Sequence, residues 1–306
     1  MSKYEIKNSI WVVLAESIKI YFTNIDKFVV YMLFPVFGQL LGIALAFGLS
    51  LGFGEKIAQR VDSVSHALLL IILLALPGLL IFAKAFWDFM VAYVAINSMT
   101  EGAISTGKVY DFQSHNEVAT RRTFKYVMFL ASVGILSALA SNVLLMIPGF
   151  ILWIYFILVY QVFTFEQDLG IVDCFKRSFA LVRGNWLRTV IILAILWFFS
   201  IHIITLGVSV VFDYLNITDK ICSLFNFVTN MIPLDFTNKV LTYFHYPIIT
   251  PDMISKSIFY TILSSIIMGL TLPIRSICWT LWYVNLSDLN RKKEVPIRKK
   301  RVKAEE

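Results

Sequence analysis

Residues 67–96 read ALLLIILLALPGLLIFAKAFWDFMVAYVAI, thirty positions with only two charged side chains, Lys84 and Asp88. A helix needs about 20 apolar residues to cross the hydrocarbon core of a bilayer, so this stretch predicts a membrane-spanning helix. The rest of the 306-residue chain has the same character, because it is 58% hydrophobic and only 15% charged. A typical globular protein is about 25% charged. The sequence therefore predicts an all-α polytopic membrane protein.

Four further apolar runs flank this stretch, and one of them, residues 126–165, is too long for a single crossing. It contains Pro148 followed by Gly149, a pair that is typical of turns, so we divide it there into two helices. The prediction is a bundle of six membrane-spanning helices within residues 1–288, followed by a basic tail at residues 289–306. The six helices are expected over residues 28–53, 67–96, 126–147, 150–165, 189–212 and 257–284.

The distribution of Lys and Arg predicts the orientation of the chain. Twenty of its 27 basic residues lie in the N-terminal segment, the second and fourth connections and the tail, and only five lie in the other connections. Because cytoplasmic segments of membrane proteins carry the excess of Lys and Arg, both termini are expected in the cytoplasm. The net charge of +7 forms no single basic face, so we expect no nucleic-acid partner. The expected partners are membrane lipids, with anionic lipids favoured, and a homo-oligomer or a membrane-protein partner stays open.

Amphipathic segments are predicted on both sides of the membrane. Before the first span, apolar residues recur with the helical period, which is typical of a helix in the headgroup layer; a soluble helix packed on the loops is the alternative. The stripe consists of Ile10, Val13, Leu14, Ser17, Ile18 and Tyr21. The far-side segment 213–255 contains two more such pieces, a first with Asp219 as N-cap and a second over residues 236–244. Thr250 and Pro251 then predict the start of the last span.

Residues 166–188 carry the most specific pattern in the chain. An acidic residue and a glycine precede an amphipathic helix, whose apolar positions run from Ile171 to Val182, and Gly184 ends that helix. With the preceding Pro148-Gly149 hairpin, this segment resembles the YciC-like bacterial inner-membrane proteins and the membrane domain attached to some glycerophosphodiester phosphodiesterases. The matching positions are Glu166, Gly170, Arg177, Ser178, Leu181, Val182 and Gly184.

The resemblance implies a multi-span membrane domain without an assigned activity. In the second family the phosphodiesterase chemistry belongs to a separate soluble domain, and we expect none here because only about twenty residues follow the last predicted span. No phosphodiesterase chemistry is carried over to this chain.

Several charged side chains are predicted near the cytoplasmic end of their spans. Such groups are candidates for function because a charge inside the membrane is costly. Basic pockets between spans on the cytoplasmic side bind lipid headgroups. We therefore expect a headgroup pocket in which two carboxylates orient the cations; snorkelling with local ion pairing is the alternative. The candidate residues are Lys84, Asp88, Glu166, Arg177, Arg183 and Arg275.

Catalytic and metal-binding patterns are missing from the sequence. The four histidines and three cysteines show no metal-ligand spacing, and no nucleophile, phosphate-binding or dinucleotide-binding motif occurs. Gly38 and Gly42 in the first span form a small-xxx-small pair, which predicts close helix packing, with a flexible gate as the alternative. The sequence predicts a non-enzymatic protein without cofactors that binds anionic lipid or supports membrane homeostasis. A secondary transporter, or a subunit of one, is the second hypothesis.

Overall fold

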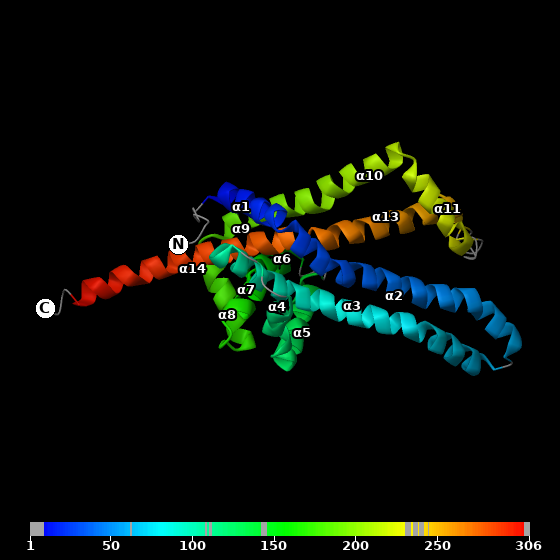
Figure 1. Ribbon diagram of the computed structural model, residues 1–306, viewed down its shortest axis with the longest axis horizontal. Helices are drawn as coiled ribbons and strands as arrows, with labels where there is room; N and C mark the ends of the chain where they lie inside the picture. The colour runs from blue at the N-terminus through cyan, green and yellow to red at the C-terminus, as the bar shows by residue number, and fades with distance from the viewer. Residues whose placement is uncertain are drawn as a thin grey trace. The chain divides into compact units, whose positions relative to one another are not determined.

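The structure is a computed structural model that describes residues 9–61, 63–107, 109, 112–141, 146–229, 234, 238, 242–243 and 245–302. These residues form helices and no strand (Figure 1). Five helical segments are long and apolar enough to cross a membrane. They are Ile25–Ser50, Ser65–Thr106, Met146–Phe165, Trp186–Tyr214 and Pro251–Asp288. A pair of helices bent by 73°, Phe112–Thr120 and Thr123–Leu139, raises the number to six if it crosses as one. The prediction of an all-α polytopic membrane protein is confirmed.

The chain divides into two compact units. The first consists of the residues up to Ala194 together with those from Leu272 onward, and the second of Ile195–Thr271. The apolar runs of the sequence predict one bundle and give no sign of this division.

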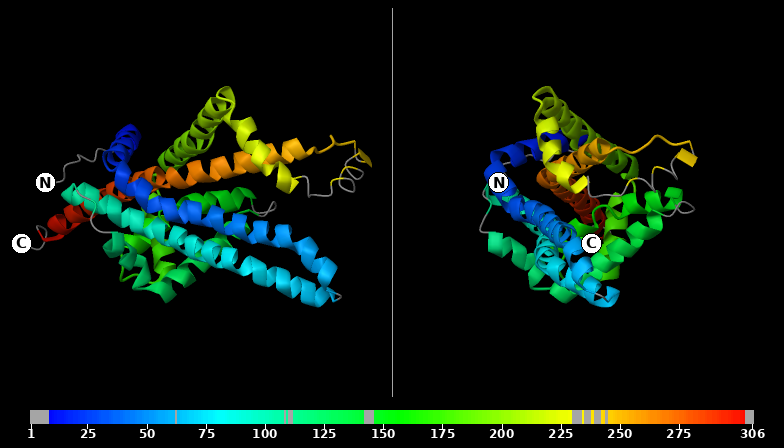
Figure 2. Two further views of the ribbon diagram at one scale, coloured as in Figure 1. Left: turned by 45° about the vertical axis from the view of Figure 1, so that its right-hand side comes forward. Right: turned by 90° about the vertical axis from the view of Figure 1, so that its right-hand side faces the viewer.

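Two long antiparallel helices, α2 (Ile25–Arg60) and α3 (Val64–Thr106), form a hairpin in the first unit (Figures 1 and 2). Glycines allow their backbones to approach closely. A Cβ atom added to Gly42 would lie 2.5 Å from the Phe82 nitrogen, and one added to Gly78 would lie 2.3 Å from the Ala46 nitrogen. At Gly38 it would lie 2.8 Å from the Ala85 Cβ atom. The predicted close packing at Gly38 and Gly42 is confirmed, since small residues at a helix interface permit this approach.

Both helices of the hairpin are longer than a bilayer core is thick. At 1.5 Å per residue, α2 with 36 residues is about 54 Å long and α3 with 43 residues about 64 Å, against a core of about 30 Å. The side chains of α3 change character along this length. Between Leu68 and Leu80 most large apolar side chains are exposed, whereas from Val91 to Ile104 most are buried. Helix α3 therefore has one part exposed to its surroundings and one part inside the first unit.

Seven further helices complete the first unit around the second half of α3. They are α1 (Ile10–Thr23), α4 (Phe112–Thr120), α5 (Thr123–Ala140), α6 (Met146–Tyr155), α7 (Val159–Phe165), α8 (Ile171–Val182) and α14 (Leu272–Val302), joined by most of α9 (Trp186–Trp197). Aromatic rings fill much of the core. The Phe129 and Phe163 rings stack at 4.5 Å between centroids, and the Tyr160 ring meets that of Phe129 edge-on at 5.1 Å. Such contacts stabilise the core beyond the area they bury.

Helix α1 packs against α14. Its buried residues are Val13, Ser17, Ile20 and Tyr21, three of which belong to the predicted stripe. The prediction is wrong at its edge, because Ile18 is 48% exposed whereas Ile20 is fully buried. Helix α1 is apolar on two faces, so the helical period alone does not fix the edge of the buried stripe. The second face exposes Trp11 and Phe22.

The second unit contains the π-helix η2 (Phe198–Ile203), α10 (Ile204–Tyr214), α11 (Ile217–Thr229) and α13 (Pro251–Leu270). Its core gathers around Cys222, Phe259, Leu263 and Ile267. The predicted cap of α13 is confirmed, because the Thr250 hydroxyl accepts a hydrogen bond of 3.3 Å from the Met253 amide. Asp219 is not the N-cap predicted for α11 but lies in its first turn. Most of the second predicted amphipathic piece, residues 236–244, lies outside the described residues.

Candidate functional site

Lys84 and Asp88 lie one turn apart on α3 and form an ion pair, as their spacing predicts. The Lys84 Nζ atom is 2.5 Å from both carboxylate oxygens of Asp88 and 5.8 Å from the centre of the Phe34 ring. The Lys84 side chain is 62% exposed, and the Asp88 side chain is 28% exposed. The neighbouring Leu80 and Phe86 are also exposed. A charged pair thus stands on an otherwise apolar outer surface.

Glu166, which directly follows α7, forms a second ion pair with Arg177 of α8. The Glu166 Oε1 atom accepts a hydrogen bond of 2.9 Å from Arg177 Nε and another of 2.9 Å from the Tyr283 hydroxyl of α14. Both charged side chains are partly buried. This carboxylate therefore connects α8 and α14 to the loop and compensates the charge of Arg177.

Two cations at the start of α5 bind main-chain carbonyl groups of the same loop. Arg122 donates to the carbonyl oxygens of Phe163 at 3.2 Å and Gln167 at 3.3 Å. Lys125 donates to those of Gln167 at 3.2 Å and Leu169 at 2.5 Å. Among the described residues, neither cation forms an ion pair with a carboxylate. They satisfy carbonyl groups at the carboxyl end of α7, where positive charge is favourable.

The remaining positions of the 166–188 pattern serve packing. The Ser178 hydroxyl donates to the Tyr155 carbonyl oxygen at 2.9 Å, and Leu181 and Val182 are buried. Gly184 has a φ angle of +88°, which residues other than glycine rarely adopt. The pattern thus encodes how α8 begins, packs and ends.

Among the six predicted site residues, the structure brings Lys84 to Asp88 and Glu166 to Arg177. Arg183 is exposed, and Arg275 is partly buried. One pocket that contains all six residues stays a prediction.

The two ion pairs also lie at different levels of α3. The Asn97 side chain donates to the Thr164 hydroxyl at 3.2 Å, which places the end of α7 beside Asn97. Asn97 is thirteen residues beyond Lys84, about 20 Å along the axis. The groups expected at one depth included Lys84 and Glu166, and this distance places those two residues at different levels.

A buried polar cluster on α3, α7 and α14 is the feature that the sequence analysis missed. The Asn97 Oδ1 atom accepts hydrogen bonds from Ser276 at 2.6 Å, Thr280 at 3.2 Å and the Gln161 amide at 3.2 Å. All are buried, and the Gln161 Oε1 atom has no hydrogen-bond partner among the residues that the structure describes. One signal was present, because Ser276 and Thr280 lie one turn apart within the last apolar run. Their acceptor, Asn97, lies 179 and 183 residues earlier in the chain, and no local pattern connects it with them.

Two cavities accompany these groups. One, of about 340 Å³, lies between α5 and α6 and has an almost entirely apolar lining. The other, of about 250 Å³, lies in the second unit and is lined by Asp213, Thr218, Asp219, Lys256 and Tyr260. Asp213 accepts hydrogen bonds there from Thr218 at 2.5 Å and Tyr260 at 3.0 Å.

Metal-binding geometry does not occur in the part of the chain that the structure describes, where no three His, Cys, Asp or Glu side chains are placed to share an ion. The three cysteines are buried and unbridged. Comparison with known proteins finds no matching family model, and no curated protein or solved structure with significant similarity to this chain.

Proposed function

We propose that this chain is a non-enzymatic protein of the bacterial inner membrane that binds anionic lipid headgroups on the cytoplasmic side, with both termini in the cytoplasm. Lys84 is the main headgroup contact, and the exposed Arg183 adds positive charge on the same side. Kinship with the YciC-like family, on the pattern at residues 166–188, belongs to the same proposal.

The observation that carries the proposal is the position of the Lys84–Asp88 pair at the end of an uncharged segment. Residues 67–83 of α3 hold no charged side chain and are about 25 Å long, close to the thickness of the hydrocarbon core. Lys84 follows directly and is exposed beside Leu80 and Phe86. At the other end of the hairpin, α2 carries Lys56 and Arg60. A bilayer around this segment has Lys84 in its headgroup layer.

The chemistry of the pair suits an anionic headgroup. A lysine ammonium has three donors, and Asp88 holds it in place through charge-assisted hydrogen bonds to its two carboxylate oxygens. A remaining donor is open to a phosphate. Each basic residue near an anionic membrane surface contributes about 1 kcal/mol of attraction. Arg177 is not assigned this role, because its partner Glu166 follows the end of α7, which lies beside Asn97, about 20 Å further along α3.

The test compares two double variants with the same change of charge. Lys84→Gln with Arg183→Gln removes the proposed contacts, and Lys56→Gln with Arg60→Gln removes two cations from the opposite end of the hairpin. Native mass spectrometry would measure the ratio of phosphatidylglycerol to phosphatidylethanolamine retained by each protein. We expect the first variant to lower this ratio about tenfold and the second to leave it unchanged. An equal ratio in both variants would contradict headgroup binding at Lys84.

A second function, transport of a small polar solute, is favoured by the buried cluster around Asn97. Three helices contribute neutral donors and acceptors to it, and transporters bind their substrates between spans with such groups. The shrinkage of proteoliposomes in glycerol or glucose, followed by light scattering, tests this function. Solute entry no faster than in protein-free vesicles would count against transport of these solutes, whereas entry that is abolished by Asn97→Leu would support it.

A further inference from the structure

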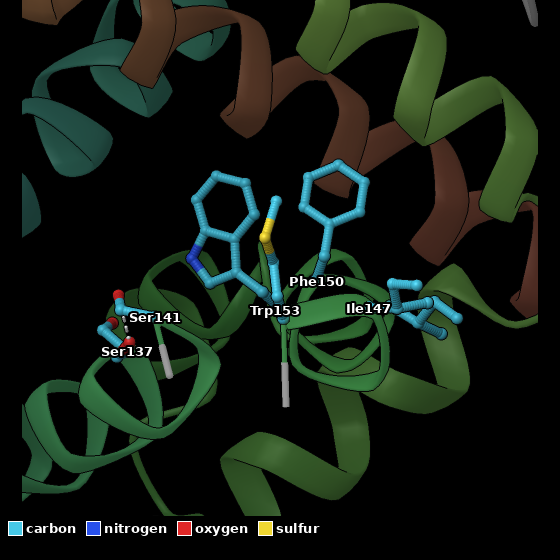
Figure 3. Close-up of a pocket in the computed structure, with 7 residues that line it drawn as sticks. Ser137, Ser141, Ile147, Phe150 and Trp153 are labelled. Atoms are coloured by element: carbon cyan, nitrogen blue, oxygen red, sulfur yellow. Dashed lines mark hydrogen bonds between the residues drawn. The ribbon is translucent and has the colours of Figure 1, made fainter. Parts of the chain in front are cut away.

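The cavity between α5 and α6 has an unusual lining for a site open to the outside. It lies between Ser137 and Ser141 on one side and apolar residues of α6 on the other, and it encloses about 340 Å³ (Figure 3). The α6 residues include Met146, Ile147, Phe150 and Trp153. Among the described residues that line it, none is charged.

One of the two serine hydroxyls among the described lining residues is already satisfied within α5. The Ser141 hydroxyl, at the end of α5, donates to the main-chain carbonyl oxygen of Ser137 at 2.8 Å. A polar solute that entered would exchange its hydrogen bonds to water for an apolar wall, which is unfavourable. A water molecule would find too few partners there. The lining selects an apolar ligand.

Two aromatic rings form one wall. The Phe150 and Trp153 ring centroids are 6.2 Å apart and their planes are tilted by 30°. Both rings point to the same side of α6 (Figure 3). They are only partly covered by the protein, since Phe150 is 49% exposed and Trp153 is 37% exposed. Two such faces provide a flat, rigid surface along which a chain of methylene groups can lie.

The surroundings of the cavity define which apolar ligand reaches it. The segment Met146–Phe165 is apolar enough to cross a membrane, and α5 belongs to the bent pair that meets the same criterion. The hydrocarbon of a bilayer therefore surrounds both walls, and the alkyl chains of lipids are its main component. Exposed side chains at the rim, Met146 and Ile147, are apolar as well.

We propose that the cavity between α5 and α6 is a binding site for one alkyl chain of a membrane lipid, held against Phe150 and Trp153. None of the basic residues assigned to headgroup binding lines this site. The proposal therefore goes beyond the proposed function and is tested independently of it. It differs from ordinary lipid contact because a chain in a cavity is retained, whereas a chain on a convex helix surface exchanges freely.

The experiment uses the full-length protein in digitonin, a detergent without an alkyl chain. The probe is palmitic acid with a photoreactive diazirine in mid-chain, and the labelled peptides are identified by mass spectrometry. We expect labelling of the Met146–Trp153 segment that saturates at one probe per chain. Unlabelled palmitic acid should displace the probe, and glycerol 1-phosphate, which has no alkyl chain, should not.

A pair of serine variants on α5 provides the matched control. Ser137→Leu places an apolar side chain in the cavity, and Ser132→Leu makes the same change at a position outside the lining. We expect Ser137→Leu to reduce labelling of the segment at least fivefold and Ser132→Leu to leave it unchanged. The Lys84→Gln, Arg183→Gln variant should label like the unmodified protein, which separates this site from the headgroup contact.

Two results would overturn the proposal. One is labelling of the segment that rises with probe concentration without saturation, which means nonspecific contact. The other is equal labelling in both serine variants. If Ser137→Leu does not elute as a single species on gel filtration, saturation and competition in the unmodified protein decide the question.

Discussion

The close contact between α2 and α3 makes a sharp prediction for the variant Gly78→Ala. The added Cβ atom would lie 2.3 Å from the Ala46 nitrogen and 2.6 Å from the Gly42 carbonyl oxygen. Both are main-chain atoms, so the two helices must separate to make room. Overpacking of this kind costs about 1–3 kcal/mol. Alanine regains about 0.5–1 kcal/mol through its higher helix propensity. The expected net loss of stability is therefore about 1–2 kcal/mol.

Gly48→Ala on α2 is the matched control. The substitution is the same and lies within the same hairpin, but nothing lies within 4 Å of the added atom. Thermal unfolding in detergent, followed by circular dichroism, would measure both variants. We expect Gly78→Ala to lower Tm by about 2–8 °C and Gly48→Ala to leave it unchanged or raise it. A Tm shift of the same sign and size in both variants would refute the reasoning from backbone contact.

Three further predictions concern the first unit. Asn97→Ala leaves three buried donors without their acceptor and should lower the free energy of unfolding by about 2–4 kcal/mol. The control Thr100→Ala removes one hydrogen bond of 2.7 Å within α3 and should lower it less. Equal losses in the two variants would contradict a stabilising role for the cluster. Gly184→Ala should lower the free energy of unfolding by about 1 kcal/mol, because Gly184 has a positive φ angle. Gly134→Ala, which has open space around the added atom, should not lower it, and the unfolding midpoints of the two variants measure the difference. Burial raises the pKa of the Cys174 thiol, so iodoacetamide should modify it slowly at pH 7 and faster as the pH rises; modification at pH 7 as fast as in the unfolded protein would contradict this.

The apolar helices were predictable because their signal is local. A run of about 20 apolar residues identifies a span without any knowledge of its neighbours. The start of α13 at Thr250 and Pro251 and the glycine contacts at Gly38 and Gly42 follow from equally short patterns. Prediction fails first at the ends of elements. The apolar run of α3 ends near Ile96, but the helix continues to Thr106 because its side chains are buried by other parts of the first unit.

The candidate site was less predictable because depth does not determine proximity. Counting residues from the end of each span placed Lys84, Glu166 and Arg275 at one level. The hydrogen bond between Asn97 and Thr164 shows that α7 is shifted along α3 relative to that count. The ion pair of Lys84 with Asp88 was predictable because it lies within one helix. The cluster around Asn97 was not, since it depends on how three helices are placed against one another.

The glycine contacts of the α2–α3 hairpin also bear on how the protein enters the membrane during translation. The residues that hold the hairpin together lie within 60 positions of one another and are synthesised before the helices that bury the second half of α3. Contacts between segments that are close in sequence form quickly. The hairpin can therefore leave the translocon as a paired unit. The Asn97 side chain gains its hydrogen-bond partners later, when α7 and α14 have been synthesised. A ribosome stalled shortly after Thr106 has emerged should already carry a hairpin whose two helices can be joined by a cysteine cross-link.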